Sequence, residues 1–322
     1  MKKLLAILLA CLLLPVFAGC GAEQAEETDI TLNIYSLKGP TSMGLVKLMD
    51  DNSRGEAANT YEVQMVTAAD EVTAAIASGK ADIAMLPANA AATLYQKMGG
   101  FTVVAVNTLG VLYIVENGTS VQSVDDLAGK TVYLTGKGTT PEYALRYLLD
   151  AHGIEDRVTL EFKSEPKEVV SAMTEDVAAI GLLPQPFATT ALMQNESLRI
   201  ALDLTQEWAA VSQDSSLITG VTLVRNEVLE AHPAQVESFL TEYAASIDYV
   251  NQNPAQAATW IADLGIVGNA VVAEKALPYC NLVCMTGSEM KTALSGYLQS
   301  LYDRNPDAVG GAMPDDKFYY VK

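Results

Sequence analysis

Two pairs of matching motifs recur at almost one spacing along this chain of 322 residues. ADIAMLPANAAATL parallels AAIGLLPQPFATTA, and their prolines, Pro87 and Pro184, are 97 residues apart. LKGPTSMG is echoed by LTGKGTTPEYAL, in which Thr139 lies 98 residues after Thr41. Because the two pairs nearly share an offset, the sequence predicts two lobes of similar plan. The alternative is that strand-to-helix turns look alike wherever they occur.

Short strand-like segments alternate with helical segments between these motifs. This alternation is typical of α/β lobes with largely parallel sheets. The predicted strands are Thr31–Ser36, Tyr61–Val66, Ile83–Leu86, Val103–Val106, Val111–Val115, Thr131–Leu134, Thr159–Phe162, Ala179–Leu183 and Val221–Arg225. The clearest predicted helices are Ala69–Ser78, Pro141–Ala151, Pro166–Thr174, Pro233–Gln252 and Ser288–Asp303. The chain is also longer than one compact core usually holds, which again favours two lobes.

Four junctions share one chemistry, in which an apolar strand ends, Gly or Pro turns the chain, and a helix begins. The first amides of a helix lack partners within it, and the helix dipole adds partial positive charge there. In open α/β sheets such helix starts gather beyond the carboxyl ends of the strands, where small ligands bind. We therefore predict a donor-lined cleft with hydroxyls from Thr41, Ser42, Thr139 and Thr140, and close backbone approach at Gly39 and Gly138. Alternatively these hydroxyls only cap their helices, and the two roles can coexist.

Residues 1–19 are similar to a bacterial export signal. Met1–Lys3 is basic, and the apolar run Leu4–Phe17 is too short to span a bilayer comfortably. The segment ends in Phe17-Ala18-Gly19-Cys20, which resembles a lipobox, although Phe17 stands where leucine is usual. We expect a lipid on Cys20 followed by a flexible acidic tether over residues 20–29. The alternative is an ordinary secretory signal that leaves Cys20 free.

The charge of the chain is strongly acidic, with 20 Lys and Arg against 39 Asp and Glu and a formal net charge of −19. This balance argues against a nucleic-acid partner, because phosphate binding needs a basic surface. The acidic pairs Asp50-Asp51, Asp125-Asp126 and Asp315-Asp316 lie at predicted turns and helix ends, where solvated faces explain them.

Cys280 and Cys284 remain to be explained once Cys11 is assigned to the signal and Cys20 to the anchor. A helix would bring them near disulfide range, whereas a strand would hold them too far apart. The β-favouring residues between them favour two unbridged, buried thiols, with a strained bridge as the alternative. His152 and His232 lack metal-ligand spacing, so neither a metal nor a cofactor is expected.

The motifs, taken in order, resemble the substrate-binding lipoproteins of ABC importers, and most closely the nitrate, sulfonate, taurine and thiamine-precursor group. VDDLAGKTV is the most specific segment, followed by ASGKADIAMLP and GLLPQPFA. The likeness covers essentially the whole chain beyond the signal. The last motif departs from the family, because Gln185 stands where an acidic residue commonly precedes Pro-Phe.

This resemblance implies a periplasmic-binding-protein type II fold, in which hinge closure traps a ligand between two lobes. Each lobe would hold a mixed, mostly parallel sheet flanked by helices. The resemblance places the crossings near residues 107–110 and 217–220, so lobe one is 30–107 plus 220–322 and lobe two is 108–219. It maps ligand contacts onto the four junctions, at Lys38, Gly39, Pro40, Thr41, Ser42, Pro87, Asn89, Lys137, Gly138, Thr139, Thr140, Gln185 and Phe187.

Several of these candidates have a purely structural alternative. Lys38 and Lys137 occupy nearly matching places and either pair with an acidic ligand group or extend into solvent. Asn89 either binds a ligand or caps its helix. Phe187 either stacks on a ligand ring or packs on its own helix.

The implied function is a monomeric, extracytoplasmic receptor, anchored by lipid, that delivers a small solute to an ABC permease and its ATPase. A sensing lipoprotein that partners a receptor kinase is a second interpretation. No nucleophile elbow, phosphate loop or zinc signature indicates an enzyme, although the same fold serves a few enzymes. Because few basic residues lie in the four junctions, we expect a neutral or weakly acidic organic ligand, such as an aromatic heterocycle, rather than sulfate or nitrate.

Overall fold

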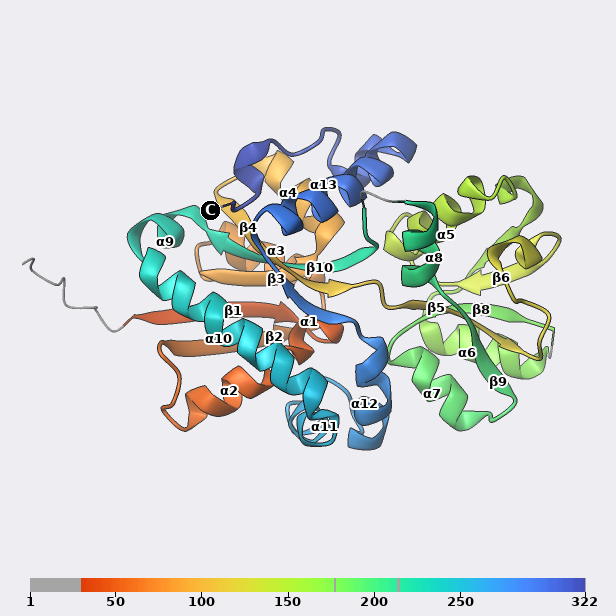
Figure 1. Cartoon of the computed structure of the whole chain (residues 1–322), viewed down its shortest axis with the longest axis horizontal. Coiled ribbons are helices and arrows are strands. Elements are labelled where there is room, and N and C mark those ends of the chain that lie inside the picture. The colour runs from red at the N-terminus through yellow and green to blue at the C-terminus, as the bar shows by residue number, and fades with distance from the viewer. Residues whose placement is uncertain (1–29, 177, 213–214, 322) are drawn as a thin grey trace, which may run out of the picture.

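The computed structural model describes residues 30–176, 178–212 and 215–321, which form two sheets flanked by helices (Figure 1). The predicted signal, Cys20 and the tether lie outside these residues. Within the described ranges, no helix is both long enough and apolar enough to cross a membrane.

The first sheet has the strand order β11-β4-β10-β3-β1-β2. Its strands are β1 (Thr31–Leu37), β2 (Thr60–Val66), β3 (Ile83–Pro87), β4 (Phe101–Leu109), β10 (Ile218–Arg225) and β11 (Leu282–Met285). β1 pairs in parallel with β2 and β3, whereas β10 is antiparallel to β3 and β4, and β11 is antiparallel to β4. The helices that follow or cover these strands are α1 (Pro40–Met43), α2 (Val46–Ser53), α3 (Ala69–Ala77), α4 (Ala88–Met98), α9 (Asn226–Ala231), α10 (Pro233–Gln252), α11 (Pro254–Asp263), α12 (Ala270–Ala276) and α13 (Gly287–Arg304).

The second sheet has the order β7-β6-β8-β5-β9. Its strands are β5 (Leu112–Asn117), β6 (Thr131–Leu134), β7 (Thr159–Phe162), β8 (Ile180–Pro184) and β9 (Leu198–Asp203), accompanied by helices α5 (Thr140–Ala151), α6 (Pro166–Glu175), α7 (Phe187–Gln194) and α8 (Leu204–Val211). β6 is parallel to β7 and β8, and β5 is antiparallel to β8 and β9. Short 3-10 turns complete the chain at η1 (Val124–Leu127), η2 (Glu155–Arg157), η3 (Leu277–Tyr279), η4 (Pro306–Val309) and η5 (Asp316–Phe318).

The two sheets repeat one plan, as the paired motifs predict. A parallel set β2-β1-β3 is bordered by antiparallel β10, and the set β7-β6-β8 is bordered by antiparallel β5. The sheets are mixed, and antiparallel pairing takes a larger share of them than we predicted. The reason is that β5 and β10 each enter a sheet from the side where its parallel strands end. Each of them therefore runs antiparallel to those strands. Strand β9 was not predicted.

The chain first passes between the sheets along two strands. β4 runs through Gly110 and Val111 directly into β5, and the return leads from α8 into β10. Figure 1 shows β4 and β5 as one path between the sheets, which lie at opposite ends of the long axis. Asn281 holds this crossing, because its Nδ2 donates to the Gly110 carbonyl at 2.6 Å.

An aromatic group joins helices that belong to different sheets. The buried Trp208 of α8 stacks on Tyr147 of α5 with ring centroids 3.9 Å apart, and it contacts Tyr297 of α13 at 5.7 Å. Its indole N–H donates to the Ser215 hydroxyl at 2.8 Å, so burial leaves this polar atom satisfied. The packing places α13 of the first sheet against α5 and α8 of the second.

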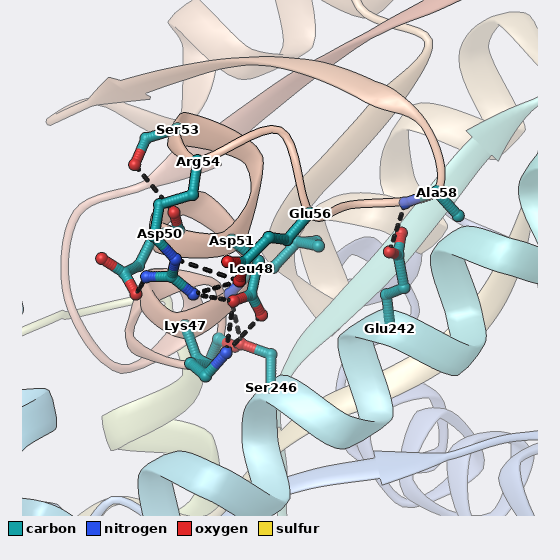
Figure 2. Close-up of polar contacts among 11 residues, drawn as sticks. Lys47, Leu48, Asp50, Asp51, Ser53, Arg54, Glu56, Ala58, Glu242 and Ser246 are labelled. Atoms are coloured by element: carbon teal, nitrogen blue, oxygen red, sulfur yellow. Dashed lines mark hydrogen bonds and ion pairs between the residues drawn. The ribbon is translucent and has the colours of Figure 1, made fainter.

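Helix α2 and the loops on either side of it are hydrogen-bonded to the long helix α10 (Figure 2). Ser246 accepts the Leu48 backbone N–H at 3.0 Å and donates to the Gly44 carbonyl at 2.6 Å, while Glu242 accepts the Ala58 N–H at 2.6 Å. The acidic pair Asp50-Asp51 lies at the end of α2, as predicted, and forms partly exposed ion pairs there: Asp51 with Lys47, and both Asp50 and Asp51 with Arg54. Pairs of this kind on a surface contribute little to stability.

The two cysteines are unbridged, which confirms the preferred arrangement. Cys280 is buried beside η3 and Cys284 is half-buried in β11. Burial raises the pKa of Cys280 to about 12, and burial together with Asp248 raises the pKa of Cys284 to about 11. Both thiols therefore stay protonated at neutral pH and are poor nucleophiles.

Asp82 of the ADIAMLP motif ties three strands together at the sheet edge away from the junctions. Its Oδ2 accepts from the Asn33 backbone N–H at 3.0 Å and from Asn33 Nδ2 at 2.8 Å, and its Oδ1 accepts from Arg225 at 2.8 Å. Burial alone would raise the pKa of this carboxyl, but the hydrogen bonds from Asn33 and Arg225 outweigh burial and lower it. The ionised Asp82 is therefore the stable form in the folded protein.

Replacing Asp82 with Asn should lower the free energy of unfolding by roughly 1–3 kcal/mol at pH 7, because the bonds to a charged acceptor are weakened. A lowered folded-state pKa contributes stability above the unfolded pKa of about 4, and that contribution is lost as pH falls through the folded pKa. The gap between wild type and Asp82→Asn should therefore shrink below about pH 4 in urea titrations. Glu227→Gln, which alters the exposed partner of the same Arg225, is the control; an equal loss there would contradict the assignment.

Candidate functional site

The four predicted junctions follow the carboxyl ends of β1, β3, β6 and β8. In each sheet these strand ends lie on the side from which the chain crosses to the other sheet. β4 runs in the direction of β1 and β3, and β5 starts at the edge where β6 and β8 end. In the sheet register Pro87 lies opposite Gly220 of β10, and Pro184 lies opposite Leu112 of β5. Each Leu-Pro junction is thus a direct neighbour of a crossing strand.

The first junction, before α1, is folded onto the first sheet. Thr41 and Ser42 are buried, and their hydroxyls donate to carbonyls of their own turn, Leu37 at 2.9 Å and Gly39 at 3.0 Å. Both hydroxyl protons are therefore used within the turn, and the Ser42 Oγ also accepts the Gly39 backbone N–H at 3.3 Å. Pro40 takes the first position of α1, where its missing N–H costs no hydrogen bond.

Beneath Thr41 lies a buried polar cluster that the sequence did not reveal. Asn107 donates to Thr222 at 3.0 Å and accepts from Thr108 at 2.9 Å. A Cβ on Gly220 would stand 2.4 Å from Asn107 Oδ1 and 2.5 Å from Thr41 Cγ2, so only glycine fits. The cluster joins the first junction to both crossing strands. Its residues are scattered through apolar strands, and no local pattern marks them.

The second and third junctions meet. Asn89 lies in the first turn of α4 and Thr140 is the first residue of α5, and the Thr140 Oγ1 is 3.5 Å from Asn89 Oδ1. Tyr297 of α13 is buried close to this pair; burial raises its pKa to about 12, while Thr140 acts to lower it. The first turn of α4, which follows the first sheet's β3, thus lies beside the first turn of α5, which follows the second sheet's β6.

The third junction is held by a carboxylate of its own helix. Glu142 accepts the Gly138 backbone N–H at 2.7 Å, and Thr139 donates to the Gly136 carbonyl at 2.6 Å. Burial would raise the pKa of Glu142, but Gly138 and Arg146 outweigh it and lower the pKa below its ordinary value. The amide of Gly138, where close approach of the backbone to a ligand is predicted, is therefore engaged within the turn.

The two lysines at matching places are both exposed, and neither one points to the other. The Lys137 ammonium lies 5.7 Å from the centroid of the Phe162 ring at the end of β7. Lys38 extends toward Gly265, 3.7 Å from where a Cβ would stand there. Their sequence match does not bring the two side chains together.

The two candidate residues of the fourth junction, Gln185 and Phe187, lie in different surroundings. Gln185 is 2 % exposed and its backbone N–H donates to the Val111 carbonyl of the crossing at 2.9 Å. Phe187 is 39 % exposed and lines an outer groove between α6 and α7. Gln185 therefore lies at the crossing, while Phe187 lies against α6, apart from the other junctions.

A cavity of about 550 Å³ lies between α7 and the segment from α12 to η3. One wall comes from the second sheet's elements and the other from the first's, and most of the surface is apolar. The lining residues are Thr189, Leu192, Met193, Glu196, Ile200, Lys275, Pro278 and Tyr279. The Tyr113 hydroxyl of β5 donates to the Tyr279 carbonyl at 2.7 Å, which sets the position of η3 against the second sheet. No sequence motif pointed to this cavity.

An ionic ladder links the third junction to α13. Arg146 bonds to Glu142 at 2.8 Å and to Glu155 at 3.0 Å, and Arg304 at the end of α13 bonds to Glu155 at 2.9 Å. Arg304 also donates to the Arg146 carbonyl at 3.1 Å. The ladder therefore runs from the Gly138 turn of the second sheet to the last helix of the first.

A family model described as NMT1/THI5 like matches residues 59–257, which include every strand that crosses between the sheets. The chain belongs to the NMT1/THI5-like family. A search of curated protein sequences gave no match.

Solved structures show the same fold as this NMT1/THI5-like protein. An ABC transporter protein from Parabacteroides distasonis is 24% identical with a TM-score of 0.75, covering 91% of this chain and 100% of that one. The periplasmic aliphatic sulphonate binding protein SsuA from Escherichia coli is 16% identical with a TM-score of 0.69, covering 91% and 96%. The desulfurization enzyme DSZB is 12% identical with a TM-score of 0.60, covering 91% and 96%. The fold is therefore that of known solute-binding proteins and of at least one enzyme.

Replacing Glu142 with Gln in this NMT1/THI5-like protein should speed hydrogen exchange of the Gly138 amide several-fold, because a neutral acceptor binds the N–H less strongly. Glu168→Gln is the matched control, since Glu168 holds the Ser164 N–H at 2.9 Å in the same way at α6. It should affect the amide of Ser164 and leave Gly138 unchanged. Equal exchange of Gly138 in wild type and Glu142→Gln would contradict the assigned bond.

Proposed function

We propose that this protein is the extracytoplasmic solute-binding receptor of an ABC importer, which captures a small organic molecule between two lobes and presents it to a permease. The observation that carries the proposal is the meeting of helix starts from both sheets, Asn89 and Thr140, beside strands that cross directly between the sheets. Family membership and the named solute-binding proteins of the same fold support it.

The proposed lobes are residues 30–107 plus 220–322 and residues 108–219, with the hinge at the two crossings. Such a hinge needs few residues that change backbone conformation, and Gly110 and Val111 between β4 and β5 are the natural ones. A ligand that contacts both lobes binds the closed form better and so shifts the population toward it.

The proposed ligand is neutral or weakly acidic, such as an aromatic heterocycle. The two lysines of the junctions lie over Phe162 and beside Gly265, and the junctions carry no arginine, so a small inorganic anion would find no paired cations. Helix-start amides and the lone pairs of Thr41 and Ser42 suit polar groups of an organic solute instead. A protein of the same fold, SsuA from Escherichia coli, is an aliphatic sulphonate binding protein, so organic sulfonates are part of the test.

The proposal includes attachment to the outer face of the cell membrane through a lipid on Cys20, with residues 20–29 as the tether. A tether of this kind would keep the receptor near its permease while letting the lobes turn freely. Metabolic labelling with a radioactive fatty acid, compared between wild type and Cys20→Ser, measures the attachment directly.

The function is tested by a thermal-shift screen of neutral organic solutes, organic acids, organic sulfonates and inorganic anions. An organic ligand present at about 100 times its Kd should stabilise the protein by about 2.7 kcal/mol, which raises Tm by several degrees. Thr140→Val combined with Asn89→Ala should weaken that ligand several-fold, whereas Thr190→Val, which faces the outer groove, should leave it unchanged. Stabilisation by inorganic anions or sulfonates alone would contradict the ligand class, and no binding from any class would contradict the function.

The ionic ladder should favour the closed arrangement of the lobes. Arg304→Gln should shift the balance toward the open form by roughly 1 kcal/mol, about fivefold, because Glu155 loses a partner from the other lobe. Small-angle scattering of the unliganded protein would show a larger radius of gyration, and added salt should produce the same change in wild type. Lys291→Gln, which removes a pairing with exposed Asp316 inside lobe one, is the control. If the radius of gyration of Arg304→Gln equals that of wild type, these ion pairs do not stabilise the closed form.

A further inference from the structure

Two charges of opposite sign line the cavity between α7 and the segment from α12 to η3. Glu196 follows the end of α7 and lies in the wall that the second sheet's elements form. Lys275 lies in the last turn of α12, in the wall that comes from the first sheet's elements. Both side chains are exposed, and within the described ranges neither one has an ion-pair or hydrogen-bond partner. Each wall therefore offers one charge that a bound molecule can neutralise.

The surface between the two charges is apolar and incompletely covered. Its apolar lining residues are Leu192, Met193, Ile200, Pro278 and Tyr279. Met193 is 40 % exposed and Tyr279 is 44 % exposed, so a molecule in the cavity would remove apolar surface from water. The Tyr279 ring is set edge-on to the Tyr113 ring, with centroids 5.9 Å apart. A tyrosine ring together with a methionine sulfur suits an aromatic group of a ligand.

The size and position of this cavity make it a site of its own. Its volume of about 550 Å³ lies within the range of small-molecule pockets, which is roughly 300–1,000 Å³. Helices α7 and α12, which belong to different sheets, lie side by side at its walls (Figure 1). None of the junction residues, all of which lie in the described ranges, lines it. The hydroxyl hydrogen of Thr189, the buried polar residue in its lining, is already donated to Gln185. Recognition of a charged solute here therefore depends on Glu196 and Lys275.

We propose that this cavity binds a zwitterionic solute with an aromatic body, such as an aromatic amino acid, whose ammonium group pairs with Glu196 and whose carboxylate pairs with Lys275. The aromatic body lies against the apolar wall between them. The inference goes beyond the proposed function, because this site is separate from the four junctions.

The two charges determine which solutes the cavity accepts. A purely anionic solute pairs with Lys275 but is repelled by Glu196, and a purely cationic solute meets the reverse. Only a solute that carries both charges neutralises both walls. Because an exposed ion pair changes affinity by up to about fivefold, the apolar wall supplies most of the affinity and the charges supply the selectivity.

Calorimetry with four probes that share one aromatic ring tests this assignment. The probes are L-phenylalanine, phenylalaninamide, N-acetylphenylalanine and N-acetylphenylalaninamide, which carry both charges, the ammonium alone, the carboxylate alone and neither. At pH 6 the free amines of the first two are protonated. Wild type should bind L-phenylalanine with a Kd of about 1 mM or below, and each other probe at least about threefold more weakly.

Reversing one charge at a time gives a readout that a merely structural role would not move. Glu196→Lys gives both walls a positive charge, so it should lose about tenfold in affinity for L-phenylalanine and prefer N-acetylphenylalanine, since repulsion replaces a favourable pair. Lys275→Glu gives both walls a negative charge and should prefer phenylalaninamide. The double variant should regain the preference for L-phenylalanine, because the zwitterion can bind the other way round.

Glu175→Lys is the matched control for these variants. It makes the same change of charge in the groove between α6 and α7, on an exposed residue outside the cavity. All four probes should bind this variant as they bind wild type. An equal loss of L-phenylalanine in Glu175→Lys and Glu196→Lys would show a general effect of charge and would overturn the inference.

Three further results would overturn the inference: no measurable binding of L-phenylalanine to wild type, equal binding of all four probes, or charge reversals that leave the order of the probes unchanged. Loss of L-phenylalanine in Thr140→Val combined with Asn89→Ala, but not in Glu196→Lys, would place the amino acid at the junctions and would overturn it too.

Failure of this site and failure of the proposed function are distinguishable. If the wide screen finds an organic ligand while L-phenylalanine binding does not respond to the two charges, the function stands and this site falls. If L-phenylalanine binding responds to the two charges while the screen finds no other ligand, this site stands and the proposed function falls.

Discussion

The arrangement of the whole molecule depends on one constraint, the direct passage of β4 into β5 through Gly110 and Val111. A strand continues in the direction in which it enters, so β4 arrives at the second sheet from the edge where the parallel strands of that sheet end. The carboxyl ends of β1 and β3 consequently face those of β6 and β8. The helix starts at Asn89 and Thr140 consequently meet beside the crossing.

This geometry explains why several polar side chains are buried at the crossing. Asn107, Thr108 and Thr222 satisfy one another there, and Asn281 and Tyr113 hold the neighbouring loop through backbone carbonyls. Networks of this kind are stable only when each member has a partner. Two polar atoms near the crossing have no partner in the described ranges, the Nε2 of Gln185 and the Oγ1 of Thr205 beside Gly110.

Local sequence patterns predicted much of the fold correctly. Helix α10 begins and ends where the apolar periodicity and Pro233 placed it, and the β-branched run at Thr131–Leu134 is strand β6. Such features depend on neighbours a few residues away, which a single sequence contains. Strand β9 escaped because Arg199 and Asp203 interrupt its apolar pattern, and its partner β5 lies far earlier in the chain. The partners of Asp50 and Asp51 also escaped, because side-chain directions around a helix end decide them.

The candidate site shows the same division. The sequence by itself determined that four Gly- or Pro-containing turns start helices, that two of the turns repeat the other two, and that their residues are small and polar. Only the tertiary structure decided which of these groups are free. In the folded protein the hydroxyls of Thr41, Ser42 and Thr139 donate to carbonyls of their own turns. Phe187 lines an outer groove, and Asn89 lies beside Thr140. Hydrogen-bond partners across a cleft are set by the packing of whole sheets, and that packing depends on contacts between residues far apart in the chain.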